Sequence, residues 1–397
     1  MYLTRYEERL LDGEEGEVVE RAMRLLVTLG EVFGAERLVE VRSAHISGVS
    51  YRNLGEAGLS FLEEQAEAGA RTRVRATLNP AGMDLERWRE MGVPEGFAER
   101  QLRIISAFER MGVEVTCTCT PYLVGHLPGL GEQVAWAESS AVAYSNSVLG
   151  ARTNRETGPT TLASAVTGRA ALYGYRLTEN RAPTAIVKVE EPPVSRLGFS
   201  ALGYLVGSEV GSGVPYLRGL GRPALEDLKA LGAAAATSGG VALYHVEGVT
   251  PESRSFASSD LRGLEEFDVE RRDLDEVISG LSVEVGDPVV CLGCPHCSLR
   301  EVEEVARLLE GRRLKRRLWV FTSRGVYAEA ERRGLVAVIE DAGGRVFRDT
   351  CMVVAPLEEM GVGEVSTNSC KAAHYLANRG VKARLGDVDT LIREALR

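Results

Sequence analysis

Charged and apolar residues alternate at helical spacing near the start of the chain, within residues 5–40, and this pattern predicts an amphipathic helix. The pattern then changes. Residues 38–41 and 71–77 are short, mostly apolar or alternating stretches of the kind found in strands, and a polar loop follows each of them. The beginning of the chain therefore reads as strand, polar loop and helix.

The same cycle recurs further along the chain. We predict helices at residues 97–111 and 299–309 and strands at residues 113–116, 289–290, 318–322 and 345–347. Alternating strands and helices fold into α/β layers, in which ligands gather at the carboxyl ends of the strands. Three of the predicted strands run into cysteine-bearing segments, at Cys117, Cys291 and Cys351. An active site is expected where these segments meet.

A charged run at residues 265–275 predicts a boundary region between about residues 270 and 290. We expect an α/β region over residues 1–280, made of two subdomains, and an α/β domain over residues 281–397. The first contains Cys119, and the second contains Cys294 and Cys351. A site built from these cysteines would draw on both parts.

Composition narrows the function. The 397 residues are 44% hydrophobic and 26% charged, which is typical of a globular protein. A net charge of -10 disfavours broad binding to nucleic acid or to an anionic membrane, and a small-molecule substrate fits better. We expect no membrane span and no signal peptide, because no apolar stretch is long enough. Together with an odd number of cysteines, seven, this predicts reduced thiols in the cytoplasm.

The cysteines at residues 117–119, 291–297 and 351 allow several kinds of site. A ferredoxin-type cluster would need a fourth cysteine three residues after the run at 291–297, and a structural zinc site would need a second Cys-x-x-Cys pair. The chain has neither. From the residues alone, two interpretations remain: an iron–sulfur site assembled from separate segments, and buried thiols that pack as small hydrophobic side chains.

Other polar residues suggest a binding site less specifically. His45, His126 and His296 lie in polar, loop-like contexts and are candidates for a role in the site. Arg152 and Arg155 lie in a stretch rich in planar groups that could bind a carboxylate or phosphate, although a solvated turn has the same composition. The chain has no Walker A loop, dinucleotide fingerprint or nucleophile elbow in its expected surroundings.

Several longer motifs make the chain resemble the aconitase X family, from about residue 43 to residue 397. They are Cys119-Thr-Pro-Tyr122, Trp136-Ala-Glu138-Ser-Ser140, Tyr144-Ser-Asn146-Ser147, Gly150-Ala-Arg152-Thr-Asn154-Arg155-Glu156, Leu292-Gly-Cys294-Pro-His296, Asp349-Thr-Cys351 and Asn368-Ser-Cys370-Lys371-Ala-Ala-His374.

The resemblance implies an aconitase-like fold, with several α/β domains around an iron–sulfur cluster. Cys119, Cys294 and Cys351 match the family's cluster-ligand positions, and we expect a [4Fe-4S] cluster with one open iron. In some members the swivelling domain that completes the site is a separate small subunit. We expect this chain to lack that domain and to form a heterodimer with a small subunit that supplies the catalytic base.

Two activities are implied for a member of this family. One is dehydration of (R)-5-phosphomevalonate to trans-anhydromevalonate 5-phosphate, in the archaeal-type mevalonate route to isoprenoids. The other is dehydration of cis-3-hydroxy-L-proline. Scarce glutamine, with only Gln65, Gln101 and Gln133, is compatible with a thermophile and, with the expected separate subunit, favours the first. From another class, an iron–sulfur redox or sensor protein is the alternative.

The site residues that we expect fall into two groups. The predicted catalytic residues are His126, Glu138 and His296. The predicted substrate-binding residues are Ser47, Asn79, Asn146, Ser147, Arg152, Asn154, Arg155, Lys188 and Lys371.

Overall fold

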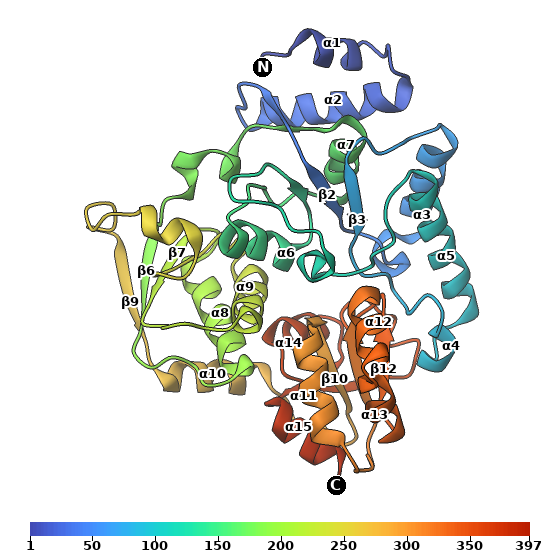
Figure 1. The fold of residues 1–397 in the computed structure, drawn as a ribbon, viewed down its shortest axis with the longest axis vertical. Coiled ribbons are helices and arrows are strands. Elements are labelled where there is room, and N and C mark those ends of the chain that lie inside the picture. Colours follow the sequence, from blue (N-terminus) through green and yellow to red (C-terminus); the bar gives the residue numbers. More distant parts are fainter.

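Four β-sheets organise the chain in the computed structural model, which describes all of residues 1–397 (Figure 1). Three of the sheets are parallel, and the two-stranded sheet of β1 and β5 is antiparallel. We divide the chain by these sheets into an N-terminal module (residues 1–181), a middle module (185–281) and a C-terminal module (289–397). The α/β prediction is confirmed.

The N-terminal module has a three-stranded sheet in the order β3-β2-β4, beside the β1–β5 pair. Its elements are α1 (Arg5–Leu11), α2 (Glu17–Val32), β1 (Leu38–Glu40), β2 (Ser43–Ile46), α3 (Tyr51–Glu67), β3 (Arg75–Leu78), α4 (Trp88–Met91), α5 (Glu95–Arg110), β4 (Ala135–Trp136), α6 (Ser139–Tyr144), a π-helical turn (Ser145–Leu149), α7 (Gly158–Thr167) and β5 (Arg169–Ala171).

The middle module has a four-stranded parallel sheet in the order β8-β7-β6-β9. Its elements are β6 (Ala185–Val189), α8 (Arg196–Val210), β7 (Pro215–Arg218), α9 (Leu225–Ser238), β8 (His245–Val246), β9 (Glu265–Val269) and α10 (Arg271–Leu281). Helices α8 and α9 pack so closely that a Cβ atom on Gly203 would lie 2.1 Å from the carbonyl oxygen of Leu231. Only glycine allows this approach.

The C-terminal module has a five-stranded parallel sheet in the order β12-β11-β10-β13-β14. Its elements are β10 (Val289–Cys297), α11 (Leu299–Leu309), β11 (Leu318–Thr322), α12 (Arg324–Arg332), α13 (Leu335–Asp341), β12 (Arg345–Arg348), β13 (Glu364–Thr367), α14 (Cys370–Ala377), β14 (Lys382–Leu385) and α15 (Val388–Ala395). The predicted elements at 299–309 and 318–322 agree with α11 and β11.

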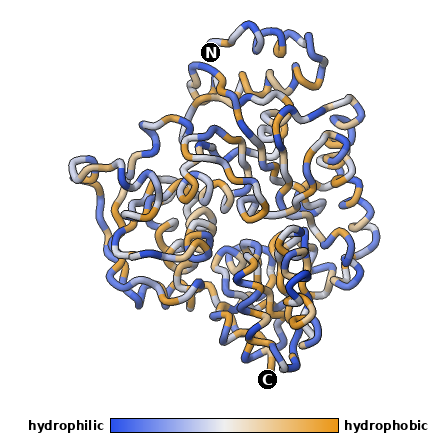
Figure 2. The backbone as a smooth tube through the Cα atoms, in the orientation of Figure 1, coloured by the Kyte–Doolittle hydropathy of each residue, from blue (hydrophilic) through white to orange (hydrophobic).

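The largest hydrophobic core runs through the middle and C-terminal modules, and also takes in Met83, Trp88 and Phe97 of the N-terminal module. A second core lies within the N-terminal module, and a third within the C-terminal one. In Figure 2, hydrophobic stretches recur along the elements that pack together, and hydrophilic stretches follow much of the outer edge. None of the helices combines the length and apolar character needed to cross a bilayer.

Two sequence-based expectations were wrong in detail. The predicted helix within 5–40 is two helices, α1 and α2, separated by a turn. The predicted strand at 113–116 forms only a single bridge to β3, because the Thr116 side chain, instead of the backbone, bonds to the backbone of Leu78 at 3.1 Å. The charged run at 265–275 forms β9, which pairs with β6, and the start of α10.

Candidate iron–sulfur site

Cys119, Cys294 and Cys351 line one pocket of about 360 Å³. Cys119 comes from the irregular segment after α5, Cys294 from β10 and Cys351 from the loop after β12. The structure therefore brings together the three cysteines that we predicted as cluster ligands, from positions up to 232 residues apart in the sequence (351 minus 119).

The backbone of β10 is irregular next to Cys294. The pairing of β10 with β11 shifts register between Leu292 and Cys297, and Gly293 has φ +107°. A Cβ atom on Gly293 would lie 2.1 Å from the carbonyl oxygen of Phe321, so this position requires glycine. Two non-glycine residues with positive φ, Cys117 and Asp349, lie two residues from the other predicted ligands. Such strain is common at functional sites.

His296 connects all three cysteine segments. Its backbone N–H donates to Cys119 Sγ at 3.2 Å, Nδ1 contacts Thr118 Oγ1 at 3.0 Å, and Nε2 contacts the carbonyl oxygen of Thr350 at 2.8 Å. The side chain is fully buried, and burial lowers the pKa of His296 to about 4. Both ring nitrogens are thus occupied by the loops that carry Cys119 and Cys351. This geometry supports a positioning role, and the predicted catalytic role stays a prediction.

The donor set fits an iron–sulfur cluster. All three thiols are free and buried, and burial raises the pKa of Cys119, Cys294 and Cys351 to about 12. Thiols in such surroundings become thiolates when a metal replaces the proton. No three Cys, His, Asp or Glu side chains are arranged to hold a single metal ion. Three sulfurs spread around one pocket, one of them accepting an N–H bond, suit a larger inorganic core.

A buried ion pair lies in the wall of the same pocket. Lys371 Nζ donates to Glu138 Oε1 at 2.7 Å and to Ser140 Oγ at 3.3 Å. Burial acts to raise the pKa of Glu138, but the charge of Lys371 and three hydrogen bonds outweigh it and hold that pKa below its usual value. Conversely, burial acts to lower the pKa of Lys371, and the charge of Glu138 raises it. Both groups stay charged, and one N–H of Lys371 remains free of a protein partner.

Asn79 also lines this pocket, so it joins Glu138 and Lys371 among the predicted residues that the structure places there. Its buried Oδ1 has no hydrogen-bond partner. Asn79 follows β3, whose neighbour β2 ends at Ile46, and the N–H of Asn79 donates to the carbonyl oxygen of Ile46 at 2.9 Å. Asn79 therefore lies at the carboxyl end of a parallel strand, where ligands gather in α/β sheets, and its substrate-binding role stays a prediction.

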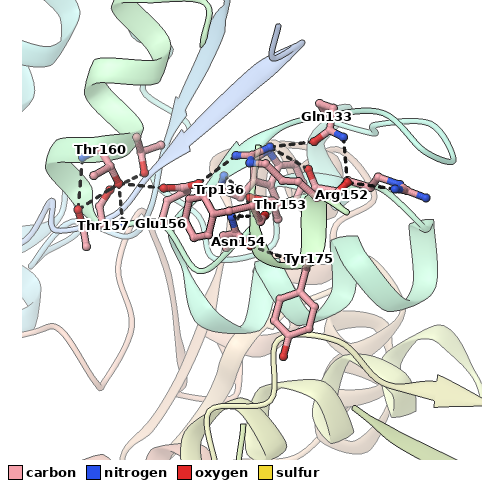
Figure 3. Close-up of polar contacts among 12 residues, drawn as sticks. Gln133, Trp136, Arg152, Thr153, Asn154, Glu156, Thr157, Thr160 and Tyr175 are labelled. Carbon is pink, nitrogen blue, oxygen red and sulfur yellow. Dashed lines mark hydrogen bonds and ion pairs between the residues drawn. The ribbon is translucent and has the colours of Figure 1, made fainter. Parts of the chain in front are cut away.

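Arg152 and Asn154, by contrast, belong to a network that holds the N-terminal module together (Figure 3). Arg152 Nη1 donates to the carbonyl oxygen of Arg176 at 3.0 Å, and the amide of Asn154 bonds to the backbone of Tyr173 and Tyr175. Neither residue lines the pocket. Their predicted role in substrate binding stays a prediction that this geometry does not support.

The remaining predicted substrate-binding residues are also absent from the pocket lining. Asn146 bonds to the backbone of Thr153 and Ala242, and Ser147 Oγ accepts the N–H of Tyr244. Lys188 pairs with Glu266 on the middle sheet, and Arg155 donates to the carbonyl oxygen of Gly240. Ser47 follows β2 and has its carbonyl oxygen against Gly158.

His126 lies in a buried polar cluster outside the pocket lining. Its Nδ1 contacts Thr77 Oγ1 at 2.9 Å, and the same hydroxyl contacts Nδ1 of His45 at 2.8 Å. The Trp136 ring packs against both histidines. Nε2 of each histidine lacks a partner, and burial lowers the pKa of His45 to about 4 and that of His126 to about 3. The predicted catalytic role of His126 stays a prediction.

Several polar residues of the pocket were not predicted from the sequence. They are Arg52, Asn53, Ser139, Tyr375, Asn378 and Arg379. One signal could have found some of them: Tyr375 lies in the helix that begins with the Lys371 motif, and Asn378 and Arg379 directly follow its end at Ala377.

Comparison with known proteins identifies the family. Models described as the first, third and second domains of aconitase X match residues 1–179, 288–397 and 183–279. The phosphomevalonate dehydratase large subunit of Methanothermobacter thermautotrophicus is 52% identical, over 99% of this chain and 98% of that protein. The cis-3-hydroxy-L-proline dehydratase of Pseudomonas aeruginosa is 39% identical, over 94% of this chain and 66% of that protein.

A solved structure agrees in fold over the whole length. The crystal structure of Thermococcus kodakaraensis aconitase X in its holo-form matches with a TM-score of 0.93 and 44% identity, covering 100% of both chains. The resemblance noted from the cysteine and Glu138–Ser140 motifs is therefore confirmed, and so is the aconitase-like fold. The chain belongs to the aconitase X family.

Proposed function

We propose that this chain is the large subunit of an iron–sulfur hydro-lyase that dehydrates (R)-5-phosphomevalonate to trans-anhydromevalonate 5-phosphate. The observation that carries the proposal is the single pocket in which Cys119, Cys294 and Cys351 meet the Glu138–Lys371 ion pair. The near full-length similarity to an archaeal phosphomevalonate dehydratase large subunit supports the choice of substrate.

Cys119, Cys294 and Cys351 would hold a [4Fe-4S] cluster. A cluster with three protein ligands supplies an open iron, a Lewis acid able to bind a carboxylate and a neighbouring hydroxyl group. His296 would keep the ligand-bearing loops in register, since its contacts reach the neighbours of both Cys119 and Cys351. Loss of such a supporting contact typically weakens metal binding about 10- to 100-fold.

Lys371 and Asn79 would orient the substrate. The N–H of Lys371 that has no protein partner can donate to the substrate carboxylate, and the ion pair with Glu138 keeps the ammonium charged despite its burial. This positive charge would stabilise the negative charge that develops next to the carboxylate as the proton there is removed. The amide of Asn79, whose oxygen lacks a partner, can bond to the substrate hydroxyl.

The reaction removes a proton from the carbon next to the carboxylate and hydroxide from the following carbon, giving an alkene and water. We propose that the base comes from a small swivelling-domain subunit and that the active enzyme is a cytoplasmic heterodimer. The name of the Methanothermobacter relative, a large subunit, supports a partner of this kind.

The test is anaerobic reconstitution of the chain with iron and sulfide, followed by mixing with its small subunit. Parallel assays would then compare (R)-5-phosphomevalonate with cis-3-hydroxy-L-proline. We expect a brown protein that releases water from phosphomevalonate only after mixing. Turnover of hydroxyproline alone would overturn the substrate, and a colourless protein would overturn the cluster. A reversible one-electron couple without dehydration would indicate a redox or sensor protein.

A further inference from the structure

The pocket has two chemically different ends. Cys119, Cys294 and Lys371 are buried, and they form its floor. Three of its other lining residues, Arg52, Asn53 and Asn378, are exposed and therefore lie at its mouth. The proposed substrate is also two-ended, with a carboxylate and a hydroxyl group at one end and a phosphate at the other. A substrate with its reacting end on the floor would present its phosphate at the mouth.

The two arginines of the pocket differ in how many donors they have left. Arg379 donates through Nε to Glu358 at 2.9 Å, and its Nη atoms donate to Glu358 and to the carbonyl oxygens of Met352, Val353 and Ala355. Every nitrogen of this guanidinium is therefore engaged by the loop after Cys351. Arg379 therefore holds that loop in place and has few N–H groups left to bind a ligand.

Arg52 is held at one corner only. Its Nη2 donates to Glu358 Oε1 at 3.0 Å, and its Nε and Nη1 have no partner within the chain. A guanidinium offers five N–H donors in a planar fork that matches two oxygens of a phosphate. The single contact with Glu358 fixes one corner of this fork and leaves its other edge available.

Charge and neighbouring donors favour an anion at this place. Glu358 lies between Arg52 and Arg379, so the three side chains carry one net positive charge. The hydrogen bond from Arg379 makes the largest contribution to lowering the pKa of Glu358, and Glu358 therefore stays ionised. The side-chain amides of Asn53 and Asn378 make no hydrogen bond within the chain, and both residues line the same pocket as Arg52, so they can donate N–H bonds to a ligand there.

We propose that Arg52 binds the phosphate group of the substrate at the mouth of the pocket, with Asn53 and Asn378 as additional donors. This inference rests on the proposed function and deepens it, because it names the residue that selects a phosphorylated substrate. Cis-3-hydroxy-L-proline has no group for this subsite to bind. The segment at Arg152 and Arg155, which the sequence suggested for this role, does not line the pocket.

The experiment compares Arg52→Ala and Arg52→Lys with Arg103→Ala in the reconstituted two-subunit enzyme. Arg103 is a matched control, an exposed arginine paired with Glu63 that does not line the pocket. We expect Arg52→Ala to raise KM for (R)-5-phosphomevalonate about 10- to 100-fold, the usual worth of a charged hydrogen bond, with a much smaller change in kcat. Arg52→Lys should recover part of this loss, and Arg103→Ala should match the wild type.

Inorganic phosphate is the second probe. It should compete with the substrate in the wild-type enzyme and in Arg103→Ala, and its inhibition should weaken in Arg52→Ala by a factor similar to the change in KM. Cluster absorbance per chain and the thermal unfolding midpoint should be the same in all variants, which excludes a folding defect. If either differs in Arg52→Ala, the comparison of Arg52→Lys with wild type decides.

The two ways of failing are distinct. An active wild type with KM and phosphate inhibition unchanged in both Arg52 variants would overturn the role of Arg52 and leave the proposed function intact. A wild type that dehydrates only cis-3-hydroxy-L-proline would overturn the proposed function, and with it the phosphorylated substrate that Arg52 is proposed to select.

Discussion

The cysteine pocket and the segment at residues 152–160 are both rich in polar groups, and motifs of both resemble aconitase X. They differ in how those groups are satisfied. In the segment, Arg152, Asn154 and Glu156 all bond to other parts of the N-terminal module (Figure 3). In the pocket, Asn79 Oδ1 and two nitrogens of Arg52 have no partner within the chain.

This difference separates scaffold from site. A buried polar group without a partner, such as Asn79 Oδ1, costs free energy that a ligand bound there would offset, and the free N–H groups of the exposed Arg52 can donate to the same ligand. A group whose bonds are complete inside the chain contributes to the shape of the protein. Arg176 and Glu156 show such pairing within the chain: both side chains are buried, and they pair at 2.9 Å, while Nε of Arg176 alone has no partner. The segment thus stabilises the module from which Cys119 and Glu138 reach the pocket.

The largest effect expected from this comparison is on the site side, in Cys294→Ser. Loss of a thiolate removes a ligand from the cluster, so we expect the brown colour to disappear and turnover to fall by more than about 100-fold. This loss is larger than the weakening of metal binding that follows loss of a contact to a ligand's neighbour. Visible absorbance and iron content would be measured beside dehydration rates. Cys370→Ala, at a buried cysteine outside the pocket lining, is the control and should keep both. Full colour in Cys294→Ser would refute the ligand assignment.

On the scaffold side, Glu156→Gln should produce the next largest effect, and on stability alone. The change leaves the charge of Arg176 buried without its partner, which typically costs about 3 to 5 kcal/mol. Denaturant unfolding would measure this loss. Protein that remains folded should bind the usual amount of iron and keep its KM for phosphomevalonate. A raised KM at normal iron content would show that the segment takes part in binding.

His296→Ala tests a residue that lies next to the proposed cluster ligands. It separates a role in positioning the ligand-bearing loops from a role in the reaction. We expect cluster affinity to fall about 10- to 100-fold, since the ring contacts to Thr118 and Thr350 are lost. Activity per bound cluster should be nearly unchanged. Iron titration followed by rate measurements at saturating iron would separate the two quantities. A variant with full occupancy and little turnover would favour the catalytic role predicted from the sequence.

The sequence was a good guide to the parts of the fold and of the site that depend on local pattern. Helix α11 and strand β11 follow from periodicity, and Cys119, Cys294 and Cys351 lie at the ends of predicted strands or near them. Which polar side chains find hydrogen-bond partners within the chain could not be predicted this way. The bonds that occupy Arg152 come from residues 176 and 178, whose place depends on the tertiary fold.

The position of Arg52 in the pocket could not be predicted from the sequence either. It lies in the first turn of α3, outside any cysteine motif, and its place in the pocket depends on the C-terminal module that contributes Glu358 and Arg379. Contacts between residues 306 positions apart (358 minus 52) leave no trace in a local pattern. The predicted boundary near residue 280 stays a prediction.

The smallest effect is expected for Arg155→Ala, and it gives the sharpest test of the scaffold interpretation. The guanidinium of Arg155 is exposed and donates to the carbonyl oxygen of Gly240 at 3.1 Å. Removing one solvent-accessible bond should change stability by roughly 0.5 kcal/mol or less. KM for phosphomevalonate and inhibition by inorganic phosphate should match the wild type, in contrast to Arg52→Ala. If Arg155→Ala raised KM as much as Arg52→Ala, an arginine whose bond is made within the chain would still contribute to the substrate site, and satisfied bonds could not serve to separate scaffold from site in this protein.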